Sequence, residues 1–223
     1  MNYTMDFSFI TRYQGLYLTG TRNTIILAVL AVLFGGLLGL VLALMRRSSL
    51  KPVKFLAAAY IEFVRGTPLL VQLFIIFYGL PVVTGMRFPD FVAGVIALSL
   101  NSAAYVAEII RAGLQSVDRG QMEAARSLGM PHNMAMRHII IPQAFKNILP
   151  ALGNEFIVVI KESAIVSVIG IYDIMRSANI VRGITYRPFE PLIVAALIYF
   201  VLTFTLSNLL GVAERRMRAG DSH

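Results

Sequence analysis

The chain has 223 residues, of which 57% are apolar and 14% are charged, with a mean hydropathy of +0.71 and a formal net charge of +8. A soluble domain of this size usually carries about 25% charged residues, so this composition argues against a soluble globular protein. The sequence therefore indicates an integral membrane protein.

Neither a metal site nor a nucleic-acid site is predicted. The chain has no cysteine, which removes disulfides and thiolate metal ligands. His132 and His138 are six residues apart beside Pro131, which is not the i, i+4 spacing of a helical ligand pair. The basic residues are spread along loops that flank apolar segments, so attraction to anionic lipid headgroups explains the positive charge without nucleic acid.

Five segments are predicted to cross the membrane as helices, which makes the fold class all-α. Uncharged runs of 21 and 23 residues occur at 25–45 and 191–213, and about 20 apolar residues span a bilayer core. The five predicted spans cover residues 22–45, 53–78, 91–114, 148–171 and 191–213. They form one domain, residues 21–213, between an expected extracytoplasmic segment (1–20) and an expected cytoplasmic tail (214–223).

The first two predicted spans contain residues that affect helix geometry. Gly35, Gly36 and Gly39 give the first span a small-residue face, which favours close contact with another helix. The second span contains Thr67 and Pro68, and a proline inside a helix predicts a kink.

Most basic residues lie on one predicted side of the membrane. Twelve Lys and Arg residues fall within the segments 46–54, 111–146 and 215–218, whereas five fall in the loops on the other side. Basic residues preferentially flank membrane spans on the cytoplasmic side. The sequence therefore predicts an N-terminus outside and a C-terminus in the cytoplasm, which agrees with an odd number of spans.

The longest predicted cytoplasmic loop, residues 115–146, contains a short helix. Residues 121–128 are predicted to form two helical turns, with Glu123 early in the helix, where a carboxylate suits the positive end of the helix dipole. Gly129 is expected just after the helix, and Pro131 prevents its continuation.

The face of this short helix is compatible with two interpretations. Ala124 and Ala125 leave a shallow surface that another protein could approach closely, but an amphipathic helix lying on the membrane explains these residues equally well. The spacing, however, resembles a family signature: Glu-Ala-Ala, three residues, Gly, nine residues, then Ile-x-Leu-Pro. With Ile141 in place of the Leu, the match falls at Glu123, Ala124, Ala125, Gly129, Ile139 and Pro142.

This signature is similar to the cytoplasmic loop of bacterial ABC importer permeases. The resemblance implies a type I ABC importer permease fold, in which residues 123–129 form a coupling helix that docks on an ATP-hydrolysing subunit. It also implies that Glu123, Ala124, Ala125 and Gly129 carry this contact.

The chain itself is expected to be non-catalytic. A P-loop requires a Gly-Lys-Ser/Thr sequence, and none of the four lysines follows a glycine. No nucleophile-base or metal-ligand constellation is present in the sequence either. The chain is thus expected to hold no cofactor, and the resemblance implies that ATP and Mg²⁺ bind to a partner ATPase.

The resemblance extends over nearly the whole chain and is greatest to permeases for polar amino acids. The segments that carry it are residues 65–72, 101–108, 153–157 and 161–170. Many relatives have Lys-Asp-Thr-Ser-Leu where this chain has Lys-Glu-Ser-Ala-Ile, and the latter version looks most like permeases for arginine, other basic amino acids or glutamine.

The resemblance also implies a set of partners and a location. A second permease subunit, identical or paralogous, is expected, with two ATP-binding subunits and an extracytoplasmic substrate-binding protein. The assembly would lie in the bacterial cytoplasmic membrane, in contact with lipid, and would import a polar L-amino acid.

Charged residues in the fourth predicted span are candidates for substrate binding. Charges at this depth are costly, so they tend to face a polar path or pair with each other. Glu155 and Glu162 are seven residues apart, about two helical turns, and therefore lie on one face. They are suited to bind the ammonium group of an amino acid and a basic side chain. Alternatively, Lys161 and Glu162 pair with neighbours and hold subunits together. A helix break near residues 161–163 would expose backbone groups to substrate, and Ser163 is a further candidate for substrate binding.

Polar residues in the third predicted span have two interpretations. Asn101 and Ser102 interrupt an apolar run, where they either contact substrate or form hydrogen bonds between helices. Glu108 and Arg111 are three residues apart, which favours a salt-linked pair on one helix.

Two other classes of function compete with an ATP-driven importer. An ion channel or a secondary transporter would also be a helical membrane protein, but it would not need the Glu-Ala-Ala loop, and its transport would not require ATP. A membrane-embedded enzyme lacks support because no catalytic constellation is present.

Overall fold

The computed structural model describes residues 4–219, with side chains as far as residue 216, and this part of the chain is helical without strands. Residues 1–3 and 220–223, the ends of the two predicted flanking segments, lie outside the described residues. The main helices are α1 (Phe9–Arg46), α2 (Lys51–Gly66), α3 (Leu69–Thr84), α4 (Asp90–Gln115), α5 (Arg119–Ser127), α7 (Ile141–Glu162), α8 (Ile174–Thr185) and α9 (Glu190–Ala219). Shorter elements are α6 (His132–Ala135), the π-helical turn η1 (Met136–Ile140) and the 3₁₀ helix η2 (Ser163–Ile169).

The centre of the fold is the contact between α1 and α4, and glycines bring the two helices together. A Cβ atom added at Gly35 would lie 2.9 Å from Cβ of Ser102, and one added at Gly39 would lie 2.7 Å from Cβ of Val106. Nothing lies within 4 Å of such an atom at Gly36. The predicted small-residue face is therefore confirmed for the first and third of these glycines.

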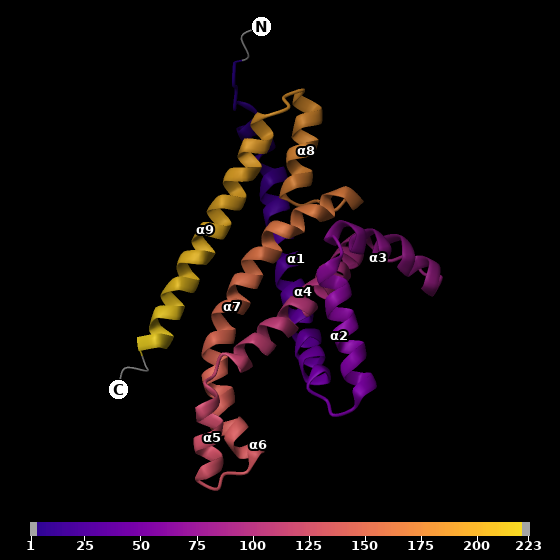
Figure 1. Ribbon diagram of the computed structural model, residues 1–223. Coiled ribbons are helices and arrows are strands. Elements are labelled where there is room, and N and C mark those ends of the chain that lie inside the picture. Colours follow the sequence, from indigo (N-terminus) through magenta and orange to yellow (C-terminus); the bar gives the residue numbers. More distant parts are fainter. Residues whose placement is uncertain (1–3, 220–223) are drawn as a thin grey trace.

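The second predicted span is not one straight helix. It is divided into α2 and α3, whose axes are bent by 111° at a short break. Pro68 disfavours the helical conformation at the residue before it, and Thr67 is extended, with φ −119° and ψ 147°. Figure 1 shows α3 projecting sideways from the end of α2. The predicted kink is confirmed, whereas a single span over residues 53–78 stays a prediction, because the bent pair is compatible with a broken span or with a re-entrant loop.

Three of the described helices, α1, α4 and α9, are long and apolar enough to cross a membrane, and the bent α2–α3 pair would make four. The fourth predicted span, residues 148–171, is not among them. Its α-helical part, α7, begins earlier and ends at Glu162, where η2 continues the chain. At residues 161–163, where a helix break is considered, the chain changes from α to 3₁₀ geometry while Ser163 stays buried, so exposed backbone groups there are not found. A count of five spans stays a prediction.

Different segments of the chain lie at the two ends of the molecule. The α1–α2 loop, the α5–α6 segment and the C-terminal part of α9 lie toward one end, and α8 lies toward the other with the starts of α1 and α9 (Figure 1). The segments predicted to be cytoplasmic are therefore together. Residues 9–20 of the expected flanking segment are helical, because α1 already begins at Phe9.

At the α8 end, a buried aspartate joins α8 to α9, and the residue after it joins α8 to α1. Asp173, in the turn before α8, accepts a hydrogen bond from the Arg176 amide (2.8 Å), and the Tyr199 hydroxyl donates to its Oδ2 (3.4 Å). The neighbouring Ile174 amide donates to Thr24 on α1. Burial raises the pKa of the Asp173 carboxyl to about 6.

Candidate functional site

A buried polar contact joins α4 to α7 at the middle of the bundle. Ser102 is fully buried and Glu155 is 7% exposed. The Ser102 hydroxyl donates a hydrogen bond of 2.9 Å to Oε1 of Glu155. The close approach of α1 at Gly35 leaves Ser102 no access to solvent on that side. The structure therefore brings these two predicted site residues together.

The neighbouring Asn101 points to the break between α2 and α3. Its Nδ2 donates to Oε1 of Gln72 on α3 (2.9 Å). Gln72 in turn donates through Nε2 to the backbone oxygens of Val64 (2.7 Å) and Thr67 (3.0 Å). These are carbonyl groups at the end of α2, where no backbone amide of the helix is left to donate to them. Gln72 therefore fixes the bend and links it to α4.

The sequence interpretation did not single out Gln72. The signal for it was present, because an amide side chain lies within an apolar run four residues after Pro68. Its partners, however, come from α2 and α4, and such non-local pairing cannot be read from spacing along one helix.

The end of α7 holds the remaining predicted substrate residues in separate environments. Ser163 is fully buried, and its hydroxyl donates to the Ile160 carbonyl oxygen (2.8 Å), one turn earlier. Glu162 is half-buried and Lys161 is exposed. Among the residues whose side chains the structure describes, 4–216, neither Glu162 nor Lys161 forms an ion pair or hydrogen bond through its side chain. Glu162 is therefore the most available carboxylate of the predicted set.

Glu155 has no cationic partner among the side chains that the structure describes. No lysine or arginine in the described part of the chain lies within salt-bridge distance of its carboxylate, and its one side-chain hydrogen bond comes from Ser102. Burying a carboxylate is costly unless it is paired or well hydrogen-bonded. A cationic group of a ligand would supply such a partner.

The short helix in the predicted cytoplasmic loop differs in its start from the prediction. It begins at Arg119, where the Asp118 carboxylate caps it by accepting a hydrogen bond from the Gly120 amide (2.7 Å). Glu123 lies in the second turn, so its predicted place at the positive end of the dipole is wrong. Gly129 has φ +83°, a left-handed conformation that favours glycine, and it ends the helix as predicted.

The outward face of α5 is formed by part of the predicted docking set. Glu123 and Ala124 are exposed, whereas Ala125 is only 2% exposed and packs inward. Leu128, which the sequence interpretation did not single out, is 85% exposed just before Gly129. Leu128 therefore lies on the exposed side of the segment, next to the predicted docking residues.

Comparison with known proteins places these features in a family. Residues 31–219 match the family model of the binding-protein-dependent transport system inner membrane component. The chain is 46% identical over 217 residues to the arginine transport system permease protein ArtQ of Bacillus subtilis, covering 97% of this chain and 99% of that one. It is 46% identical over 198 residues to a putative glutamine transport system permease protein GlnP of Rickettsia bellii, covering 89% and 91%.

Solved structures agree with the sequence relatives. A crystal structure of an amino acid ABC transporter with histidines contains a chain that is 60% identical, with a TM-score of 0.92, covering 96% of this chain and 100% of that one. The MetNI methionine ABC transporter shares the fold alone, at 20% identity and a TM-score of 0.70, covering 92% and 96%. The resemblance to ABC importer permeases is thus confirmed, and the chain belongs to the family of binding-protein-dependent transport system inner membrane components.

Proposed function

We propose that this chain is the permease subunit of an ABC importer that carries a polar L-amino acid, basic or glutamine-like, into the cytoplasm. The observation that carries the proposal is the 60% identity, over 96% of the chain, to a subunit of an amino acid ABC transporter. The names of the curated relatives, arginine and glutamine permeases, support the substrate class.

Substrate would pass along α7, where the carboxylates of Glu155 and Glu162 are. Glu162, half-buried and without a side-chain partner among the described residues, would meet the cationic group of the amino acid first. The carboxylate of Glu155, two turns earlier on the same face of α7, would then attract the cationic group of the amino acid. Ser102 and Asn101 would hold the surrounding helices in register through the hydrogen bonds they already form. Ser163 would stabilise the end of α7, where its hydroxyl donates to the Ile160 carbonyl oxygen.

The energy for transport would come from partner chains. We place the ATP-binding subunits against α5, through Glu123, Ala124, Gly129 and the exposed Leu128, with ATP and Mg²⁺ held by those subunits. Ala125 would pack α5 against the rest of the chain and would not contact the ATP-binding subunits. A second permease subunit and an extracytoplasmic binding protein would complete the importer, and α7 with η2 would act as the fifth span.

Membrane orientation has a simple test, because the chain contains no native cysteine. Met86→Cys lies in an exposed loop position after α3, and Arg119→Cys lies at the exposed start of α5. An impermeant thiol reagent added outside cells should label the first variant only. Labelling of the second variant alone would reverse the proposed topology.

Function is tested by reconstituting the chain with its ATPase and binding-protein partners in liposomes. Uptake of labelled arginine or glutamine should require ATP on the cytoplasmic side and the binding protein on the other. Uptake by the permease chain alone, independent of ATP, would instead support a channel or a secondary transporter.

A further inference from the structure

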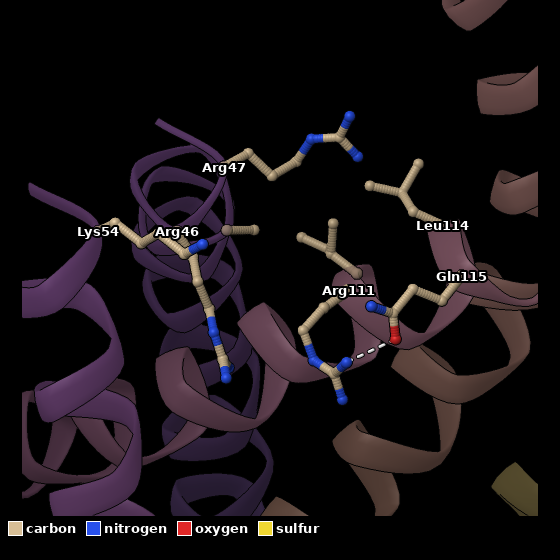
Figure 2. Close-up of a pocket in the computed structure, with 8 residues that line it drawn as sticks. Arg46, Arg47, Lys54, Arg111, Leu114 and Gln115 are labelled. Carbon is tan, nitrogen blue, oxygen red and sulfur yellow. Dashed lines mark hydrogen bonds between the residues drawn. The ribbon is translucent and has the colours of Figure 1, made fainter. Parts of the chain in front are cut away.

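A pocket lies where the end of α1, the start of α2 and the end of α4 meet, with a volume of about 380 Å³. Four basic side chains line it: Arg46, Arg47, Lys54 and Arg111. Figure 2 shows them arriving from the three helices around a common space, with Arg47 extending across one side of it. The polar amino-acid path proposed along α7 does not use these residues.

The pocket has a clear excess of positive charge. Glu108 accepts a salt bridge from Arg46 (2.8 Å) and another from Arg111, so one carboxylate serves two arginines. Neither Arg47 nor Lys54 has a carboxylate within salt-bridge distance in the described part of the chain. Glu108 thus fixes two cations in place at one side of the pocket, while two others remain available to an anion.

The surroundings of the pocket match a membrane interface. Arg46 follows directly on the uncharged run of α1, so the pocket lies at the end of a spanning helix. Large apolar side chains are exposed close by in the chain: Leu44 (61%), Leu50 (62%) and Phe55 (70%). A molecule that combines an anionic head with acyl chains would satisfy both features.

We propose that this basic pocket binds the phosphate headgroup of an anionic phospholipid, with its acyl chains against the apolar side chains beside the pocket. Arg47 and Lys54 contact phosphate oxygens, since a guanidinium can donate two parallel hydrogen bonds to them and an ammonium supplies a compact charge. Arg46 and Arg111, held by Glu108, provide the positive field behind the headgroup. A lipid bound in the pocket would thereby contact α1, α2 and α4 and hold them at one leaflet of the bilayer.

The test compares a double variant of the pocket with a matched control. R47Q/K54Q removes the two unpaired cations and leaves the Glu108 pairs intact. R215Q/R216Q removes the same charge from exposed positions near the end of α9. Native mass spectrometry of the purified full-length chain would count bound phosphatidylglycerol, with phosphatidylcholine and inorganic phosphate as the other two probes.

Wild type and R215Q/R216Q should retain phosphatidylglycerol, whereas R47Q/K54Q should bind it roughly 30-fold more weakly, given the usual attraction per basic residue at a lipid surface. Equal loss in both variants, or equal binding of phosphatidylcholine, would overturn a specific headgroup site. Displacement by millimolar inorganic phosphate would assign the pocket to a free anion instead. Unchanged lipid binding with lost ATPase co-purification would show a protein contact and overturn the proposal.

Discussion

Ser102 on α4 donates a hydrogen bond of 2.9 Å to Glu155 on α7, and this is the one side-chain hydrogen bond that the buried carboxylate accepts in the described part of the chain. The contact holds together two helices that are 53 residues apart in sequence. It fulfils one of the two sequence interpretations of Ser102, a hydrogen bond between helices, and it places the predicted carboxylate in the bundle interior.

Ser102→Ala should destabilise the fold, because Glu155 would be left buried without its donor. Loss of such a partner costs about 1–3 kcal/mol, and alanine keeps the Cβ that touches α1. Ser99→Ala is a matched control, since the Ser99 hydroxyl is buried one turn away without a hydrogen-bond partner. Melting temperatures in detergent should fall by several degrees for the first variant and stay close to wild type for the second. Equal shifts would show that the hydrogen bond contributes nothing.

Several features of the fold could be predicted from sequence because they depend on neighbouring residues. The glycine face of α1 and the end of α5 at Gly129 both follow from local spacing or backbone preference. The presence of a kink at Pro68 could also be predicted from neighbouring residues, but the bend angle of 111° could not. An apolar run of about 25 residues predicts one membrane span, and it does so whether the chain crosses the membrane as one helix or bends back within it.

The parts of the candidate site that the sequence missed depend on non-local contacts. The polar side chain of Gln72 forms hydrogen bonds with residues of α2 and α4. These helices contact Gln72 only in the folded chain. Asn101 and Ser102 are adjacent, yet they face different partners, Gln72 and Glu155. Neither assignment follows from the period of a single helix. Whether any of these residues touches substrate stays a prediction.

Gly129→Ala should weaken coupling to the ATPase. An added Cβ meets nothing within 4 Å, so the effect comes from the backbone, where φ +83° costs an L-residue roughly 1–2 kcal/mol. The end of α5 would shift and move Leu128, so we expect roughly tenfold weaker association with the ATP-binding subunits. Co-purification and substrate-stimulated ATP hydrolysis would measure this. Gly36→Ala, at a helical position with open space, should leave both unchanged; equal losses would contradict the assignment.

Stability should depend on pH through Asp173. Its folded pKa of about 6 exceeds the ordinary value of 3.8, so the folded state holds this proton more tightly than the unfolded state does. The contribution to stability is therefore complete below about pH 4 and is lost as the pH rises through 6, by about 3 kcal/mol. Asp173→Asn keeps an acceptor for the Arg176 amide and removes the charge. Melting curves between pH 4 and 7 should show the slope in wild type and a smaller slope in D173N; parallel curves would refute this origin.

The role of Glu162 in substrate binding carries the strongest consequence for transport. Its carboxylate is half-buried at the end of α7 and has no hydrogen-bond or ion-pair partner among the side chains of residues 4–216. A cationic substrate group that reached it would form a charge-assisted hydrogen bond, which typically contributes about 1.5–3 kcal/mol. Glu162→Gln keeps the size and a hydrogen-bonding oxygen while it removes the charge. Transport should therefore weaken by about ten- to a hundredfold, with assembly and basal ATP hydrolysis unchanged.

Glu62→Gln is the control for this measurement, because it removes one exposed carboxylate from α2 and leaves α7 intact. Uptake of labelled arginine and glutamine should be compared at several concentrations for each variant. A larger loss for arginine would indicate that Glu162 meets the side chain, and equal losses would indicate that it meets the α-ammonium group. Glu155→Gln should reduce uptake as well. If both α7 variants transported at the rate of E62Q, the acidic site would be refuted, and the two carboxylates would serve the fold alone.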